Sequence, residues 1–430
     1  MQKKFPARFG PRFSRVTSVQ RLFGVVALVV ACVTPAACAS DSGGSTIRVP
    51  ADETTIQEAV EKAHPGDLIL IAAGTYNESI EVETKDIVIR GEDRNAVILD
   101  GQFKKINGFE VSANGVAIEN LTVTGFTQNG IIFDGGYDRP EGSTPGQGKD
   151  TLVGYRVSHV TTHNNGLYGV YAFASRDGLI EYSYASGSAD SGFYVGQCKP
   201  CNAVLTNLIA EKNAIGYFGT NASGGVYVIN SEFRNNRLGM TPNSQKAELL
   251  EPQEDTVVAG NWVHDNDDPQ SPEIARGYFG GGIAIGGGTK NLVTKNLVTG
   301  HDGVGIEVTP LNENNPENNR IIGNVASGNG VDLSYGVKGG KALGNCFEGN
   351  TFGVSDPKDI EKVLPCNSAT VIEIPEPSRN QASAPKGVDY RDVPKPGPQP
   401  TMKNPETAPA LPAGPPPVVD LASIKVPKKK

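Results

Sequence analysis

The chain has 430 residues, a formal net charge of −8, 52 glycines, 30 prolines and one tryptophan. An acidic chain lacks the basic face that a phosphate backbone requires, so we expect no nucleic-acid partner. The many glycines, few methionines and little amphipathic helical pattern favour an all-β chain with many turns.

The N-terminal segment is typical of an export signal. Basic residues precede an apolar run at 22–33 that is too short for a membrane-spanning helix. We expect residues 1–38 to direct export and residues 39–46 to form a polar tether. Cys32 and Cys38 are alternative lipid anchors, and cleavage without lipidation is the third option. The expected location is the cell surface, the periplasm or the extracellular space, with a lipid anchor holding the protein to the membrane.

Residues 54–64 carry the one convincing helical pattern. Thr54 or Thr55 is the expected N-cap, and Pro65 and Gly66 end the helix. One face of the helix is apolar, formed by Ile56, Ala59, Val60 and Ala63. Four strand signals follow it: LILIAAGTY, SIEVE, IVIRG and AVILDG. A helix in this place is expected to cover the open apolar end of a solenoid.

A repeated phrase built around asparagine fills the middle of the chain. Its asparagines lie about 21 to 35 residues apart: Asn207, Asn230, Asn261, Asn296, Asn324 and Asn345. Short pieces of the form Gly-apolar-x-apolar lie between them. Such units are too short to close a core alone, so they are expected to stack as a solenoid of parallel strands. The asparagines would then point inward at one bend and bond backbone groups there.

The start of the repeat region resembles a known family. The segments Thr55-Ile-Gln-Glu-Ala-Val60, Pro65-Gly-Asp-Leu-Ile-Leu-Ile71, Gly74-Thr-Tyr76 and Ile87-Val-Ile-Arg-Gly91 are similar to the opening of right-handed parallel β-helix proteins of the pectin-lyase-like superfamily. This resemblance, which extends over about residues 47–368, implies a single-stranded right-handed parallel β-helix at 47–370 with an N-terminal cap at 47–86. The superfamily includes esterases, polysaccharide lyases, epimerases and non-enzymatic periplasmic proteins, so the resemblance implies a fold rather than a reaction.

Two rows of side chains separate when the strands are aligned on their glycines, because neighbours along a strand point to opposite faces. The expected core row is Val170, Phe193, Tyr217, Met240, Ile283 and Ile306. Tyr171, Tyr194 and Phe218 point outward on successive turns and predict an exposed aromatic column suited to sugar rings. The alternative is that these rings only cover the sheet. Inserts would wall this sheet on both sides, at about 134–151, 242–256, 265–280 and 309–319.

Charged residues at the turn entering this face are the candidate catalytic groups. They are Asp190, Lys212, Arg234, Arg237, His301 and Asp302. A carboxylate beside cations can remove a proton next to a uronate carboxylate that the cations neutralise. Glu307 points outward on the next strand and is a candidate substrate contact. Ordinary surface ion pairs are the alternative. Asp190 and Asp302 lie about four turns apart, roughly 19 Å, which is too far for a glycosidase pair.

Acidic residues and cysteines give two further predictions. Asp265, Asp267 and Asp268 offer oxygen ligands for Ca²⁺ but lack the spacing of a calcium loop, so a solvated acidic loop is the main alternative. No other cofactor is expected. Two disulfides are expected in an oxidising compartment, Cys198–Cys201 and Cys346–Cys366. A redox-active or zinc-binding Cys-x-x-Cys is the alternative for the first pair.

The composition changes after residue 370, where prolines accumulate and aromatic residues almost vanish. We therefore expect residues 371–430 to be a disordered tail. Together these features predict an exported cell-envelope β-helix protein that binds a polysaccharide or cell-wall glycan. Two alternatives stay open: an enzyme of the polysaccharide lyase or epimerase type, and a non-catalytic glycan-binding or envelope-assembly protein.

Overall fold

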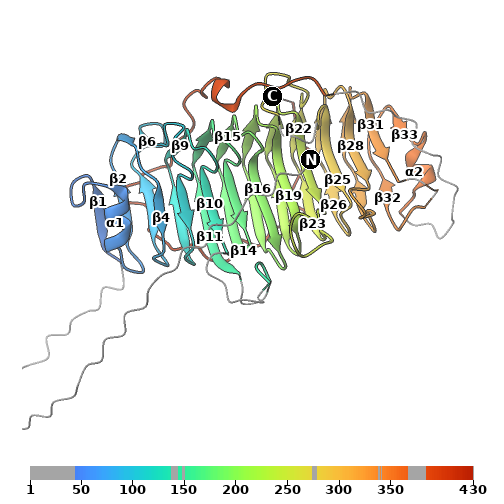
Figure 1. The fold of residues 1–430 in the computed structure, drawn as a ribbon. Coiled ribbons are helices and arrows are strands. Elements are labelled where there is room, and N and C mark those ends of the chain that lie inside the picture. Colours follow the sequence, from blue (N-terminus) through green and yellow to red (C-terminus); the bar gives the residue numbers. More distant parts are fainter. Residues whose placement is uncertain are drawn as a thin grey trace, which may run out of the picture. The chain divides into compact units, whose positions relative to one another are not determined.

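The computed structural model of the chain describes residues 44–136, 144–147, 151–273, 278–337, 339, 341–366 and 384–429. The export segment at 1–38, with both candidate lipid anchors Cys32 and Cys38, lies outside the described residues. In the described part, no helix is long and apolar enough to cross a membrane. The described strands are all short and assemble into three parallel sheets (Figure 1).

Most coils of the chain contribute one strand to each sheet in turn, and the first and last coils contribute fewer. Sheet A contains β1 (Thr46–Val49), β2 (Leu68–Ile71), β5 (Val88–Gly91), β8 (Val116–Glu119), β11 (Leu152–Ser158), β14 (Ser175–Glu181), β17 (Ala203–Thr206), β20 (Val226–Ile229), β23 (Thr256–Ala259), β26 (Leu292–Thr294), β29 (Arg320–Ile322) and β32 (Cys346–Glu348). Sheet B contains β3 (Gly74–Tyr76), β6 (Val97–Asp100), β9 (Thr122–Thr124), β12 (Thr161–His163), β15 (Tyr184–Ser186), β18 (Ile209–Glu211), β21 (Glu232–Arg234), β24 (Trp262–His264), β27 (Leu297–Thr299) and β30 (Val325–Ser327).

Sheet C completes each coil. It contains β4 (Ile80–Val82), β7 (Phe109–Val111), β10 (Ile131–Asp134), β13 (Val170–Phe173), β16 (Ser191–Cys198), β19 (Ile215–Ala222), β22 (Leu238–Asn243), β25 (Gly281–Gly286), β28 (Val304–Thr309), β31 (Val331–Tyr335) and β33 (Ser355–Asp356). Parallel strands joined in this order form a right-handed parallel β-helix, which confirms the predicted fold class.

The helix α1 (Ile56–Lys62) covers the N-terminal end of the solenoid, as predicted (Figure 1). Thr55 is its N-cap. The backbone N–H of Glu58 donates to the Thr55 hydroxyl at 3.1 Å, and the backbone N–H of Thr55 donates to the Glu58 carboxylate at 3.2 Å. Ile56, Ala59 and Val60 are buried against the first coils. A second short helix, α2 (Ile360–Val363), follows the last strands.

The predicted core row lies in register on sheet C. Val170 pairs with Phe193, which pairs with Tyr217, and the row continues through Met240, Ile283 and Ile306. All six side chains are at most 1% exposed. The alternation of strand side chains therefore identified the core correctly.

The asparagines of the repeat occupy more than one structural position, which corrects the expectation of a single inward row. Asn207 and Asn230 have positive φ values of 53° and 49°, at turn positions that asparagine tolerates. In each coil, the residue directly after this turn position is the buried one. In later coils the buried residue is an asparagine, namely Asn261, Asn296 and Asn324, and these hydrogen-bond one another from coil to coil. Separate asparagine ladders run along two other bends: Asn291, Asn319 and Asn345 in one, and Asn213, Asn236 and Asn266 in the other.

Both predicted disulfides are present. Cys198 and Cys201 have Cα atoms 4.9 Å apart and close a loop after β16. Cys346 and Cys366 have Cα atoms 4.8 Å apart and join β32 to the segment after α2. The second bridge therefore fastens the C-terminal end of the solenoid.

The C-terminal segment, residues 384–429, lies along the outside of the solenoid and includes the 3₁₀ helix η1 (Tyr390–Asp392) (Figure 1). This arrangement differs from the disordered tail expected for 371–430, of which 371–383 lie outside the described residues. Its backbone carbonyls accept hydrogen bonds from side chains of the coils. Buried Arg90, for example, donates to the carbonyls of Pro405, Ala408 and Pro409 at 3.0, 2.8 and 3.0 Å. Proline-rich backbone leaves its carbonyls unpaired within the segment, so such donors can hold it.

Candidate functional site

The three outward aromatic residues lie on adjacent strands of sheet C, as predicted. Tyr171 of β13 pairs in register with Tyr194 of β16, which pairs with Phe218 of β19. The ring centroids of Tyr171 and Tyr194 are 4.8 Å apart, and those of Tyr194 and Phe218 are 5.3 Å apart, both in edge-to-face arrangement. These distances are favourable for aromatic pairs. The parallel register thus assembles an aromatic cluster.

The expectation that all three rings are exposed was wrong. Tyr194 is 3% exposed and Phe218 is 2% exposed, whereas Tyr171 is half-buried. Tyr168 packs over the cluster, with ring centroids 4.7 Å from both Tyr171 and Tyr194. The half-buried Tyr278, from the insert at 265–280, also packs against the same cluster. Neighbouring loops therefore cover the rings from the sides and leave a narrower opening than the flat column we expected.

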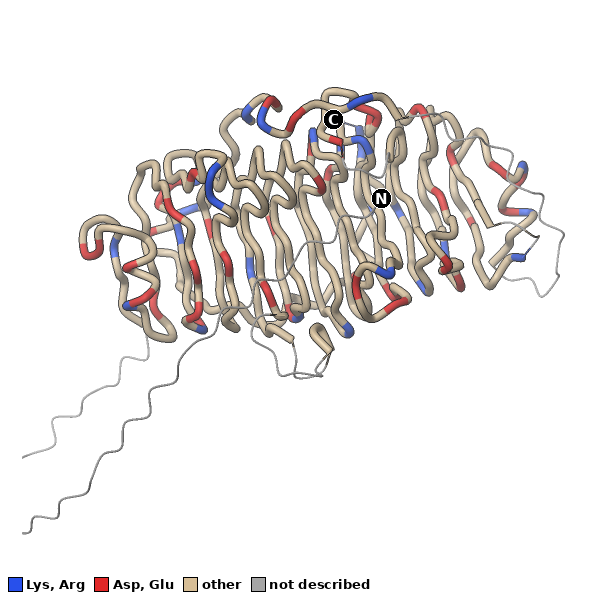
Figure 2. The backbone as a smooth tube through the Cα atoms, in the orientation of Figure 1, with Lys and Arg blue, Asp and Glu red and all other residues tan. Residues whose placement is uncertain are grey.

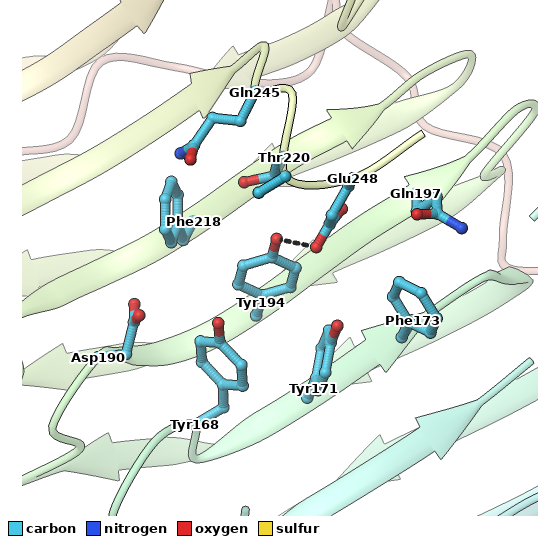
Figure 3. Close-up of a pocket in the computed structure, with 11 residues that line it drawn as sticks. Tyr168, Tyr171, Phe173, Asp190, Tyr194, Gln197, Phe218, Thr220, Gln245 and Glu248 are labelled. Atoms are coloured by element: carbon cyan, nitrogen blue, oxygen red, sulfur yellow. Dashed lines mark hydrogen bonds between the residues drawn. The ribbon is translucent and has the colours of Figure 1, made fainter. Parts of the chain in front are cut away.

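A cavity of about 300 Å³ remains above the cluster (Figure 3). Its lining is aromatic on the sheet side and polar at the rim, and comprises Tyr168, Tyr171, Phe173, Asp190, Tyr194, Gln197, Phe218, Thr220, Gln245, Ala247 and Glu248. This volume is at the lower end of the range of small-ligand pockets. Two of these residues are acidic and none is basic. The cavity therefore combines stacking surfaces with hydrogen-bonding groups and two acidic side chains.

Hydrogen bonding fixes the polar rim of this cavity. The Tyr194 hydroxyl donates to Oε1 of Glu248 at 2.5 Å (Figure 3). Burial raises the pKa of Tyr194 and of Tyr171 well above the ordinary value, so both hydroxyls stay protonated at neutral pH. The Gln197 side chain accepts from the backbone N–H of Leu249 at 2.9 Å and so ties β16 to the insert that carries Glu248. Protonated tyrosines and a carboxylate are suitable partners for sugar hydroxyls.

Two of the four predicted inserts supply residues at the aromatic cluster. The segment between β22 and β23 supplies Gln245, Ala247 and Glu248 to the cavity, and the segment between β24 and β25 supplies Tyr278 beside it. The insert at 134–151 is described only in part. Glu307 points outward in the same row as Ala284, on strands β28 and β25, and does not line the cavity.

The candidate catalytic residues are not brought together in one cluster. Asp190 lines the aromatic cavity. The Lys212 ammonium forms an ion pair with Asp268 at 3.1 Å. Arg237 is 1% exposed, donates to the carbonyl of Pro385 and lies 5.0 Å over the Phe279 ring. Both cations are thus engaged outside the cavity lining.

His301 and Asp302 lie between β27 and β28, four strand positions from Asp190 in sheet C, or about 19 Å. His301 occupies the place of an asparagine in one ladder. Its Nδ1 is 2.8 Å from Oδ1 of Asn329, its Nε2 is 3.1 Å from Nδ2 of Asn266, and the side chain is 2% exposed. Burial lowers the pKa of His301 to about 4, so the ring is neutral at pH 7. Its environment is that of a structural residue, and a catalytic role for this residue stays a prediction.

The acidic residues considered for Ca²⁺ bind other parts of the protein. Asp265 contacts Nδ1 of His264 at 2.6 Å, Asp267 accepts from the backbone N–H of Asp302 at 2.9 Å, and Asp268 pairs with Lys212. Among the described residues, no group of three or more histidine, cysteine or acidic side chains is arranged to hold a metal ion.

Tyr168 and Glu248 were missed by the sequence analysis. Tyr168 precedes β13 by two positions and lies outside the Gly-apolar-x-apolar pieces that were aligned. It lies only three positions before Tyr171, and this closeness in sequence was the available signal. Glu248 meets Tyr194 from 54 positions away, within an insert that has no repeat pattern. Only the path of that insert places the carboxylate at the cavity.

A family model agrees with the fold. Residues 146–321 match the family model for the right-handed β-helix region. Three similar solved structures are the A-module of the mannuronan C-5 epimerase AlgE4 of Azotobacter vinelandii (13% identity, 70% of this chain and 90% of that chain, TM-score 0.46), pectate lyase Pel9A (14%, 76% and 82%, 0.46) and an alginate lyase of Paenibacillus sp. FPU-7 (17%, 72% and 99%, 0.43). No curated protein matched the chain.

Proposed function

We propose that this right-handed parallel β-helix protein binds a polysaccharide at the cavity on the outer face of sheet C. The observation that carries the proposal is the cluster of Tyr168, Tyr171, Tyr194 and Phe218 beneath a polar rim. Aromatic faces stack on the apolar faces of sugar rings, and rim groups such as Gln245 bind the hydroxyls at their edges. Tyr168 and Tyr171 are half-buried and are the rings that a sugar reaches first.

The acidic side chains of the cavity favour one class of sugar over another. Asp190 and Glu248 line it, and none of the described residues that line it is basic. A uronate polymer brings a carboxylate to this surface, and like charges in a partly desolvated site repel each other. Neutral sugars and amino sugars carry no such penalty. We therefore propose a neutral or amino-sugar glycan as the ligand.

A lyase or epimerase reaction is the enzymatic alternative to plain binding. Removal of a proton beside a uronate carboxylate requires a cation that neutralises this carboxylate. The expected cations, Lys212 and Arg237, contact Asp268 and Pro385 and do not line the cavity. Binding without chemistry is therefore the function that we favour, in a carbohydrate-binding or envelope-assembly role.

We also propose that the protein is exported and held at the membrane through a lipid on Cys38 or Cys32. The two disulfides in the described part of the chain support folding in an oxidising compartment. Metabolic labelling with a radioactive fatty acid in Cys32→Ala and Cys38→Ala variants tests the anchor. Loss of label in one variant identifies the lipidated cysteine, and absence of label from the unchanged protein contradicts lipidation.

The binding proposal is tested by calorimetric titration with hexasaccharides of glucose, glucosamine and galacturonate. We expect the first or second to bind, and replacing Tyr168 and Tyr171 together with alanine to weaken that binding by about 1–3 kcal/mol, or roughly 5- to 150-fold. Tyr182 and Phe103 are exposed aromatic residues away from the cavity, at 47% and 42% exposure. Their double alanine variant is the control and should bind as the unchanged protein does.

Three outcomes would count against the proposal. The first is an unchanged affinity in the Tyr168 and Tyr171 variant, the second is no binding of either preferred sugar, and the third is equal weakening in the control. Formation of unsaturated products from a uronate polymer, followed by absorbance, would replace the binding role with the lyase alternative.

A further inference from the structure

A second cavity, of about 680 Å³, lies between the solenoid and the C-terminal segment. Residues of coils and segment line it together: Asn207, Leu208, Ile209, Asn230, Ser231, Glu232, Gly260, Trp262, Ser423, Ile424, Lys425, Val426, Pro427 and Lys428. It is placed at the bend between sheets A and B, away from the aromatic cluster of sheet C. None of its lining residues is shared with the first cavity.

The docking of Ile424 holds the basic end of the chain at this cavity. The Ile424 side chain is 5% exposed and packs on an apolar cluster of sheet A that includes Val204 and Val257. The Lys295 ammonium also donates to the carbonyl of Leu421 at 2.8 Å. The backbone of Lys425 is therefore held in place beside the bend.

The lining offers an aromatic platform and amide groups. Trp262 is half-buried, and the His264 ring stacks on it with centroids 3.9 Å apart and an interplanar angle of 20°. Since His264 covers one face of the indole, the opposite face is the one available to a ligand. Asn207 and Asn230 are exposed at the turns beside it, where their amides can bond sugar hydroxyls.

The charge of this cavity is opposite to that of the first. Lys425 and Lys428 are exposed, and neither forms an ion pair within the described part of the chain. The acidic lining residue Glu232 is 7% exposed and is bound by Arg234, with His264 Nε2 at 3.3 Å. Arg234 also pairs with Glu211, so these buried and half-buried groups hold one another, and Lys425 and Lys428 are the exposed charged side chains of the described lining.

We infer that this second cavity binds an anionic saccharide, with Trp262 stacking on a sugar ring and Lys425 and Lys428 binding its carboxylate or phosphate. The inference is independent of the proposed function, because the two cavities share no residue and favour sugars of different charge. An envelope protein with both sites would hold two glycans, or two parts of one mixed polymer, at separate faces.

Tryptophan fluorescence tests the inference directly, because Trp262 is the single tryptophan of the chain. The full chain is titrated separately with a galacturonate hexasaccharide, a glucose hexasaccharide and glucose 6-phosphate. We expect the emission of Trp262 to change with the galacturonate or the phosphate ligand, and the two responses distinguish a carboxylate from a phosphate. Raised salt should weaken the binding.

The Lys425→Gln and Lys428→Gln double variant should lower the affinity for the anionic ligand roughly tenfold, since two exposed charge contacts are lost. Lys104→Gln with Lys358→Gln changes the net charge equally at exposed sites far along the chain and should leave the affinity unchanged. The inference is overturned if no ligand alters the emission, if the glucose hexasaccharide changes the Trp262 emission at the same concentrations as the galacturonate one, or if both double variants behave alike. Loss of binding in the Tyr168 and Tyr171 variant, by contrast, concerns only the first cavity.

Discussion

Replacing Ile424 with alanine should release the end of the C-terminal segment from sheet A. The side chain is 5% exposed and contacts the apolar cluster that includes Val204, Ile229 and Val257. Truncation to alanine removes three carbon atoms, each worth about 0.8 kcal/mol when buried. The contacts lie at an edge that can partly collapse, so about 2 kcal/mol of docking free energy should be lost.

The loss should appear as local opening rather than as global unfolding, because the segment lies outside the core. A change of about 2 kcal/mol raises the population of the open form roughly 30-fold. Trypsin cleaves after Lys425 only when the segment detaches and enters its active site, and the cleavage rate then follows the open population. Mass spectrometry of the truncated product should therefore show roughly 30-fold faster cleavage in the Ile424→Ala variant, at an almost unchanged melting temperature.

Val418 provides the matched control, because it is a β-branched residue of the same segment and is 99% exposed. Its alanine variant should be cleaved at the rate of the unchanged protein. Equal rates for Ile424→Ala and the unchanged protein would refute the docking. The same conclusion would follow if the unchanged protein were cleaved as fast as a free peptide of this sequence.

Three further changes test the solenoid itself. Asn296→Ala leaves several buried partners unsatisfied and should lower the free energy of unfolding by about 3–5 kcal/mol in urea titrations. Replacing the exposed Asn207 with alanine should lower it by about 1 kcal/mol. Similar values for the two variants would contradict the separation of ladder and turn positions. Replacing Cys346 and Cys366 with serine should lower the free energy of unfolding by about 3 kcal/mol, because the bridge closes a loop with a sequence separation of 20. An unchanged free energy of unfolding in urea would argue against the bridge. Burial lowers the pKa of His301 to about 4, so the unfolded chain binds the proton first and the free energy of unfolding falls as the pH drops from about 6.5 to 4. The His301→Asn variant should keep the ladder and reduce this fall. Identical dependence of the melting temperature on pH in both proteins would refute the assignment.

The repeat of the coils was predictable because it rests on periodic patterns. Side-chain alternation indicated which row faces the core, and a capping threonine before an apolar face indicated the first helix. Asparagine was harder to interpret, because it favours two neighbouring positions for different reasons. At Asn207 it tolerates a positive φ, and at Asn296 its amide bonds the buried bend.

Contacts between distant segments had no local signal. Arg90 binds the carbonyl of Pro409 across 319 positions, and a proline-rich composition alone favours disorder. The same reason explains the covered rings of the aromatic cavity. Glu248 reaches Tyr194 only through the path of an insert, whereas the register of Tyr171 and Tyr194 followed from the repeat.

Saturation-transfer NMR on the preferred hexasaccharide tests the central claim most directly. Irradiating the aromatic protons of the protein should transfer magnetisation to the ring C–H protons of the bound sugar, because those protons lie against Tyr168 and Tyr171. We expect strong transfer in the unchanged protein and in the Tyr182 and Phe103 control variant, and little transfer when Tyr168 and Tyr171 are both alanine. Undiminished transfer in that last variant would contradict the claim that the cavity on sheet C is where the glycan binds.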